Sequence, residues 1–63
     1  MKVYQICVGS HPTNNSDYVE YDNYYTQAKT HKEALEYAKK CIDNWNKQKQ
    51  GITYNIFNVT PHN

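Results

Sequence analysis

The 63-residue sequence contains no arginine, because its seven basic residues are all Lys, and it has only two glycines and two cysteines. The arginine guanidinium binds phosphate and guanine in a bidentate manner, so its absence argues against sequence-specific nucleic-acid recognition. The glycines, Gly9 and Gly51, stand too far apart to form a glycine-rich phosphate-binding loop. The two cysteines are too few for a disulfide framework and lack CxxC or Cys/His ligand spacing, so we expect both thiols to be reduced.

Long apolar runs are also missing from the sequence. No segment approaches the roughly 20 consecutive apolar residues that a membrane helix needs, and the N-terminal residues follow a strand pattern rather than that of a signal peptide. We therefore expect a cytoplasmic protein without a membrane partner, with residues 1–63 forming a single domain. A chain of this length buries only about 60% of its unfolded surface, so its core must be small.

The residue types that commonly carry catalysis are scattered. His11, His31 and His62 are predicted to lie in a loop, a first helical turn and a tail, and none has a Ser or Cys at a recognisable catalytic spacing. We expect all three to be solvated. Cys7 and Cys41 follow apolar patterns, where a cysteine acts as a small hydrophobic residue. The sequence therefore predicts a protein that is not an enzyme and that uses no metal ion and no cofactor.

A helical pattern between Thr30 and Gly51 organises the chain. Its apolar residues fall on one arc about 120° wide, as a core-facing helix requires. They are Ala34, Leu35, Ala38, Cys41, Ile42 and Trp45. Thr30 and Glu33 have the spacing of a capping box at the start of this helix. Gly51 is expected to end it in a left-handed conformation, with Lys47 and Lys49 near its negative end.

Alternating apolar and polar residues predict three strands. They comprise residues 2–8, 17–28 and 52–59. Turn-forming residues predict a polar loop at 9–16, and residues 60–63 are expected to form a tail. The apolar register of the third strand shifts between Ile56 and Phe57, which indicates a β-bulge or a strand with two apolar faces.

This ββαβ order predicts an α+β two-layer sandwich. The first strand is expected to lie at the centre of a three-stranded antiparallel sheet, with the long helix packed on one face. Such an arrangement leaves the other face and two edge strands uncovered. Self-association into a homodimer through the open face or an edge is therefore compatible with the sequence.

The most unusual segment is 17–25, which holds three acidic residues, four tyrosines and no basic residue, whereas 29–49 holds six lysines and three acids. It is either an ordinary hydrated strand or a docking surface for a larger basic protein, because tyrosine is enriched at interfaces and carboxylates could occupy sites that otherwise hold phosphates. The partner-binding residues that we predict are Asp17, Tyr18, Glu20, Asp22, Tyr24 and Tyr25.

Two other functions compete with this hypothesis. The tyrosines could stack on the bases of single-stranded nucleic acid while lysines supply positive charge. The net charge of +1, the missing arginines and the acids beside these tyrosines argue against direct nucleic-acid binding. A small structural or assembly subunit is the third alternative.

Residues 24–45 carry a family resemblance. They read Tyr-Tyr-Thr-Gln-Ala-Lys-Thr-His-Lys-Glu-Ala-Leu-Glu-Tyr-Ala and continue to Trp45. This segment resembles HicB-type antitoxins, in which a strand ends in a Thr-Gln-Gly-like turn and enters a capped Thr-x-x-Glu-Ala-Leu helix. The Pro-Asp-x-Pro-Gly-like stretch of that family is replaced here by Asp22-Asn23-Tyr24-Tyr25, and no DNA-binding domain follows. The resemblance implies an antitoxin that blocks a small basic ribonuclease by contact.

The bias toward Lys, Asn, Tyr and Ile is typical of AT-rich coding and suggests a low-GC bacterium or its phage. A phage-encoded inhibitor of a host defence nucleoprotein, such as an anti-CRISPR protein, is equally compatible with the small size and the acidic aromatic segment. Both versions share one hypothesis. The chain is expected to neutralise a larger, basic nuclease or nucleoprotein complex by covering its binding groove.

Overall fold

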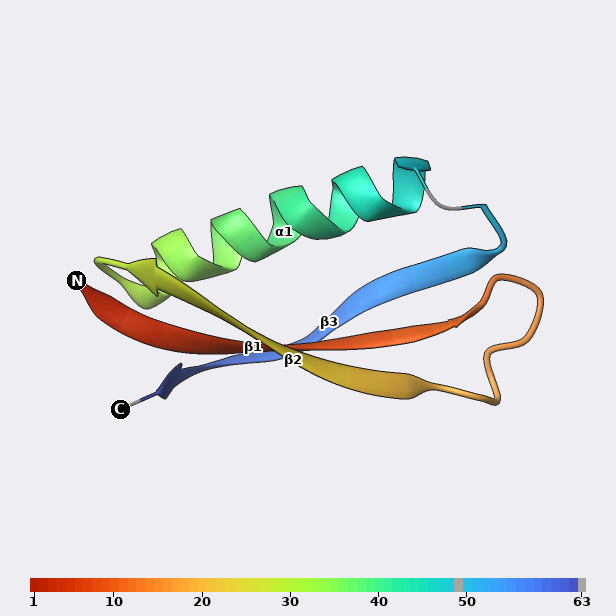
Figure 1. Cartoon of the computed structure of the whole chain (residues 1–63), viewed down its shortest axis with the longest axis horizontal. Coiled ribbons are helices and arrows are strands. Elements are labelled where there is room, and N and C mark those ends of the chain that lie inside the picture. The colour runs from red at the N-terminus through yellow and green to blue at the C-terminus, as the bar shows by residue number, and fades with distance from the viewer. Residues whose placement is uncertain (49, 63) are drawn as a thin grey trace.

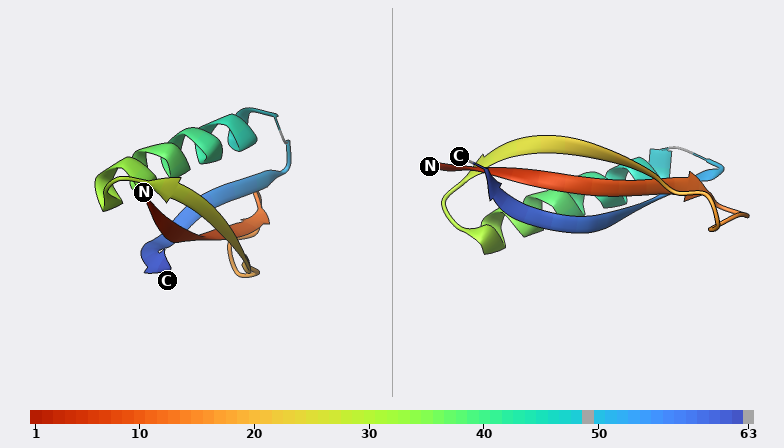
Figure 2. Two further views of the ribbon diagram at one scale, coloured as in Figure 1. Left: turned by 60° about the vertical axis from the view of Figure 1, so that its left-hand side comes forward. Right: turned by 90° about the horizontal axis from the view of Figure 1, so that it is seen from below.

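The computed structural model describes residues 1–48 and 50–62, and these residues follow the predicted ββαβ order (Figure 1). The elements are β1 (Lys2–Pro12), β2 (Glu20–Ala28), α1 (His31–Gln48) and β3 (Ile52–His62). The strands form an antiparallel sheet in the order β2-β1-β3, so the first strand is central, as predicted. Helix α1 lies across one face of the twisted sheet, which makes a two-layer α+β fold (Figure 2).

Strand β1 is longer than predicted, because it continues through residues that locally favour turns. Ser10 still pairs with Glu20 on one side, and Pro12 pairs with Ile52 on the other. Pairing with neighbouring strands outweighs the turn preference of the Gly-Ser-His-Pro stretch, since strand propensity depends strongly on context. The predicted loop at 9–16 is therefore wrong for residues 9–12.

Strand β3 is also longer than predicted, and residues 60–62 belong to it instead of to a tail. Pro61 is tolerated because β3 is an edge strand, where a missing backbone N–H need not break a ladder. Strand β2, in contrast, begins at Glu20 rather than at residue 17. These corrections move the ends of the strands and leave their order and pairing unchanged.

Residues 13–19 connect β1 to β2 and carry two of the predicted contact residues. The backbone N–H of Asp17 donates to Oδ1 of Asn15 (3.0 Å), which makes a local side-chain turn. The N–H of Thr13 donates to the carbonyl of Gly51 (2.9 Å). This bond ties the connection to the chain just before β3.

A β-bulge in β3 confirms the register shift seen in the sequence. Cys7 pairs with Asn58 while the next residue, Val8, pairs with Ile56, so Phe57 has no partner on β1. The extra residue lets apolar side chains before and after the bulge face α1. The ring of Phe57 lies on the opposite face, where it is 64% exposed.

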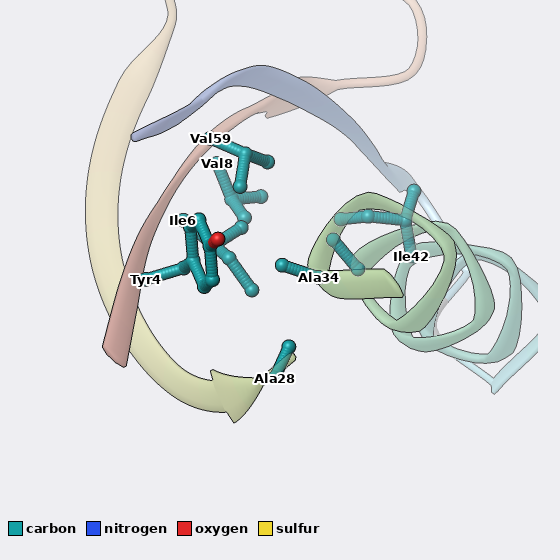
Figure 3. Close-up of a cluster of buried hydrophobic side chains, with 8 residues drawn as sticks. Tyr4, Ile6, Val8, Ala28, Ala34, Ile42 and Val59 are labelled. Atoms are coloured by element: carbon teal, nitrogen blue, oxygen red, sulfur yellow. The ribbon is translucent and has the colours of Figure 1, made fainter. Parts of the chain in front are cut away.

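The core lies between β1 and α1 (Figure 3). Its buried members are Tyr4, Ile6, Val8, Ala28, Ala34, Ala38, Ile42 and Val59. The predicted apolar stripe of the helix is confirmed for Ala34, Ala38 and Ile42, while Leu35 and Trp45 pack against the cluster from its margin. This small core is consistent with the short chain.

The N-terminal end of the helix has the predicted cap, whereas its C-terminal end differs from the prediction. The N–H of Glu33 donates to Oγ1 of Thr30 (3.1 Å), which confirms Thr30 as the N-cap. Gly51 adopts the left-handed φ of 85°, although α1 already ends at Gln48. The predicted role of Lys49 lies outside the described residues. Within residues 1–48 and 50–62, no helix has the length and apolar character needed to cross a bilayer.

A candidate contact surface along β2

The predicted partner-binding residues are all exposed. They are Asp17, Tyr18, Glu20, Asp22, Tyr24 and Tyr25. The last four belong to β2, which is an edge strand, and the first two belong to the connection before it. Among them, Tyr18 is 59% exposed and Tyr25 is 57% exposed.

Strand pairing divides these residues between the two faces of the sheet. Glu20, Asp22 and Tyr24 pair with Ser10, Val8 and Ile6 of β1. Directly paired residues share a face, and the buried Ile6 and Val8 face the helix. The two carboxylates and Tyr24 therefore lie on the helix side of the sheet.

Tyr25 belongs to the other side of the sheet, which we call the open face because α1 does not cover it. It pairs with Gln5, and Tyr21, which pairs with Gly9, lies on the same face of β2 beyond Asn23. The structure thus brings Tyr18, Glu20, Asp22 and Tyr24 together and places Tyr25 across the edge strand from them. A single flat partner surface would contact one of these sets, whereas a partner that wraps the edge would contact both.

A hydrogen bond joins two of the helix-side residues. The hydroxyl of Tyr18 donates to Oε1 of Glu20 (2.8 Å). This bond, together with the negative charge of the carboxylate, raises the pKa of Tyr18 above its usual 10.0. Both side chains border a shallow hollow of about 180 Å³ that His11 and Ile52 also line. The bond orients the phenol ring of Tyr18 over the end of the sheet.

The carboxylates along β2 are not neutralised within the described chain. In residues 1–48 and 50–62, no basic side chain forms an ion pair with Asp17, Glu20 or Asp22. The sequence explains this, because no lysine occurs between Lys2 and Lys29. These charges remain available to a cationic partner.

Tyr24 also holds the helix to the sheet, a role that the sequence alone did not reveal. Its ring centroid lies 5.2 Å from that of Trp45 on α1, and Trp45 lies 5.5 Å from Tyr54 on β3. Trp45 therefore bridges the two edge strands above the central strand. Despite this contact, Tyr24 is 43% exposed.

Two side chains fasten α1 to β3. Nε2–H of His31 donates to the carbonyl of Val59 (2.8 Å), so His31 is exposed, as expected, and also carries a bond to β3 that the sequence did not predict. Asn46 makes two bonds to the backbone of Tyr54: Nδ2 donates to the carbonyl (3.1 Å), and Oδ1 accepts from the N–H (2.8 Å). The helix is thus held toward β3, which leaves the β2 side less covered.

Among the residues that the structure describes, those of the open face carry aromatic rings and no carboxylate. The ring of Tyr21 lies 5.1 Å from that of Phe57, and the ring of Tyr25 lies 4.8 Å from that of His62. Gly9 of the central strand lies beneath the first pair. A Cβ at Gly9 would lie 3.2 Å from Cγ1 of Val19 and 3.4 Å from the Tyr21 ring, so its missing side chain lets the rings meet over β1.

Imidazole and thiol groups do not converge. Nδ1–H of His11 donates to the neighbouring Pro12 carbonyl (2.7 Å) near the end of β1. The ring of His31 lies 6.0 Å from that of Tyr4, near the beginning of β1. Cys7 and Cys41 are both free thiols of intermediate exposure, on opposite layers of the fold. Among the residues that the structure describes, no group of three His, Cys, Asp or Glu side chains could hold a metal ion.

Comparison of the chain with protein-family models, with curated proteins and with solved structures finds no match. The chemistry of β2 itself indicates what the surface can do. Unpaired carboxylates accept hydrogen bonds from ammonium and guanidinium groups, and exposed phenol rings offer flat apolar area with a polar tip. Both features suit contact with a basic macromolecule.

Proposed function

We propose that the protein is a non-enzymatic binding protein that inhibits a larger, basic, nucleic-acid-handling protein by direct contact through β2. One observation carries the proposal. Asp17, Glu20 and Asp22 are exposed and form no ion pair within residues 1–48 and 50–62, and they lie beside exposed tyrosines on β2 and on the connection before it. Such a surface can occupy a groove that otherwise holds the phosphates of a nucleic acid, because it presents negative charge of the same sign.

The spacing of the charges supports contact with several cations at once. Glu20 and Asp22 are two residues apart on one strand face, which separates their Cα atoms by about 6.7 Å. Two carboxylates at that distance can each bind a different Lys or Arg side chain of the partner. Tyr18 and Tyr24 flank them and add rigid aromatic area, which contributes much of the energy at many interfaces.

Two biological settings fit this mechanism. In an antitoxin, the partner is a small basic ribonuclease, as the resemblance to HicB-type antitoxins implies. In a phage anti-defence protein of the anti-CRISPR kind, the partner is a host nucleoprotein complex. We propose that both would act in the bacterial cytoplasm, and the identity of the captured protein distinguishes them.

Affinity capture tests this proposal. The tagged protein is incubated with lysate of a low-GC bacterial host, and retained proteins are identified by mass spectrometry. We expect a basic nucleic-acid-handling protein to be retained by the wild type and lost with the double variant Glu20→Lys/Asp22→Lys. The retained protein is then assayed for loss of its own nucleic-acid binding or cleavage. Capture that does not depend on the two carboxylates contradicts the proposal.

The matched control keeps the charge change but moves it away from β2. The triple variant Asp43→Lys/Asn58→Lys/Thr60→Lys raises the net charge by the same four units, at exposed positions of α1 and β3. We expect it to capture the partner as the wild type does. Far-ultraviolet circular dichroism checks that both variants keep the helix.

A second candidate is single-stranded nucleic-acid binding through the open face. The observation that favours it is the separation of Tyr21, Tyr25, Phe57 and His62 from the carboxylates, which pair onto the helix side. Rings on an open sheet can stack on bases. Titration of a labelled oligothymidine at low salt tests it with the wild type and Tyr21→Ala/Phe57→Ala. Absence of binding at low salt excludes this candidate.

A further inference from the structure

Helix α1 does not cover the sheet evenly, and a trough runs between it and the free edge of β2. The hydrogen bonds from His31 and Asn46 both end on β3. On the β2 side, two neighbouring hollows of about 120 Å³ and 660 Å³ share Tyr25 and Tyr37 in their linings. Together they match the size of clefts that hold small molecules or short peptide segments.

The chemistry of the trough changes along its length. The smaller hollow is apolar and aromatic, and it is lined among others by Tyr24, Tyr37, Cys41, Ile42 and Trp45. The larger hollow lies beside Thr26 and is lined by two carboxylates, Glu33 and Glu36, and also by Lys40 and by Met1, which carries the N-terminal amino group. An apolar section is therefore followed by a charged section that contains two carboxylates.

The acidic residues of β2 extend the trough in the other direction. On the helix side of β2 the order of residues is Glu20, Asp22, Tyr24 and Thr26. Read along the strand, this face meets two carboxylates, then the apolar hollow at Tyr24, and then the carboxylates of Glu33 and Glu36 near Thr26. Carboxylates therefore lie on both sides of the apolar hollow, and the β2 residues on this face are two apart in the sequence.

The free edge of β2 supplies the backbone groups. Strand β2 has nine residues and pairs only with β1 within the described sheet. Its outward N–H and C=O groups can pair with an added extended segment, a common mode of peptide recognition. Side chains of an added strand alternate between its two faces, so every second residue would meet the trough.

We propose that an extended segment of the basic partner adds to β2 as a fourth strand. One apolar side chain of this segment enters the hollow beside Tyr24 and Cys41. A cationic side chain two residues to one side of it meets Glu33 and Glu36. Cationic side chains on the other side meet Asp22 and Glu20. This inference rests on the proposed function, since it names the part of the basic partner that β2 would bind. The complementary charges select this occupant over an acidic or purely apolar peptide.

Synthetic peptides test the register. The probe is Lys-Thr-Leu-Thr-Lys-Thr-Lys, which places Leu and the three Lys on one face of a strand. The control, Lys-Leu-Thr-Thr-Lys-Thr-Lys, has the same composition and charge but places Leu on the other face. Calorimetric titration at low salt should show the probe binding at least about tenfold more tightly than the control. Equal affinity of the two peptides, or no binding of the probe, overturns the proposal.

A second pair of variants tests the location. Cys41→Trp fills the apolar hollow without changing charge, and Asn58→Trp adds the same side chain to the opposite face of the sheet on β3. We expect Cys41→Trp to weaken probe binding at least about tenfold and Asn58→Trp to leave it unchanged. Unchanged binding to a folded Cys41→Trp variant contradicts the trough.

The two proposals fail in different experiments. The peptide titrations use purified protein and decide whether β2 and α1 hold an extended basic segment. The capture experiment decides whether Glu20 and Asp22 bind a basic protein at all. The capture experiment could yield a partner that depends on these carboxylates while the protein binds the probe and control peptides equally well. That combination would refute the fourth strand but not the proposed function. Conversely, the probe peptide could bind in the predicted register while no basic protein is captured through Glu20 and Asp22. That combination would refute the proposed function.

Discussion

The rings of Tyr24 on β2 and Trp45 on α1 lie 5.2 Å apart at an interplanar angle of 53°. The contact joins the edge strand to the helix across the margin of the core. Tyr24 therefore belongs both to the packing of the fold and to the exposed contact surface, and substitutions at this position must separate the two roles.

We expect Tyr24→Ala to lower the free energy of unfolding by about 1–2 kcal/mol, because it removes the aromatic pair with Trp45 and part of the packing over β1. Tyr24→Phe keeps the ring and should change stability by less than about 0.5 kcal/mol. Urea unfolding followed by tryptophan fluorescence measures both. Equal losses in the two variants would show that the hydroxyl, rather than the ring, provides the stability.

His31 provides a second test of how the helix is held. We expect His31→Ala to destabilise the fold by about 1–2 kcal/mol, because the carbonyl of Val59 loses its partner and the edge contact with Tyr4 is lost. The exposed neighbour Lys32→Ala serves as the control and should have little effect. Chemical unfolding compares the variants. A His31→Ala protein as stable as the wild type would mean that this bond contributes nothing to holding α1.

Gly51 tests the turn between α1 and β3. Its φ of 85° is left-handed, and no atom lies within 4 Å of a Cβ built there. Gly51→Ala should therefore cost only the backbone strain, about 1 kcal/mol. Gly51→Asn should cost less, since asparagine tolerates this conformation better than alanine. Thermal unfolding of the three proteins gives the order; a stabilised Gly51→Ala variant would contradict the left-handed turn.

Tyr18 should show a distinctive pH dependence. Its pKa is raised by the hydrogen bond to Glu20 and by the charge of that carboxylate, so Tyr18 should ionise at higher pH than an ordinary tyrosine. A raised folded-state pKa means that the bond contributes stability below pH 10.0 and that the contribution is lost as pH rises through the folded pKa. Alkaline titration of the Tyr18 ring resonances by NMR measures it.

Glu20→Gln provides the control for this titration. It removes the charge while keeping a side chain of similar shape, so the pKa of Tyr18 should fall toward 10.0. An unchanged Tyr18 pKa in Glu20→Gln would show that the two side chains are not bonded in solution.

Much of the fold could be predicted because each element carries its own local signal. The cap at Thr30, the apolar stripe through Ala34, Ala38 and Ile42, and the bulge at Phe57 are all visible as spacing in the chain. The strand ends could not be predicted in this way. Residues 9–12 favour turns locally and become strand because both neighbours pair with them.

The contact surface could be predicted only in part. Alternation alone placed Glu20, Asp22 and Tyr24 on one face of β2, and strand pairing confirms that placement. Sequence spacing could not show that Trp45 meets Tyr24, because that contact depends on where α1 sits above the sheet. The trough beside β2 also depends on where α1 sits above the sheet. The hydrogen bonds from His31 and Asn46 of the helix hold it toward β3.

The central claim is that the exposed carboxylates of Glu20 and Asp22 on β2 bind a basic protein. The most direct measurement is the affinity of the captured partner, in purified form, for the wild type, for Glu20→Lys/Asp22→Lys and for the charge-matched control Asp43→Lys/Asn58→Lys/Thr60→Lys. The account predicts that the β2 variant loses at least about a hundredfold in affinity while the control loses less than about threefold. Equal affinity of both variants would contradict it.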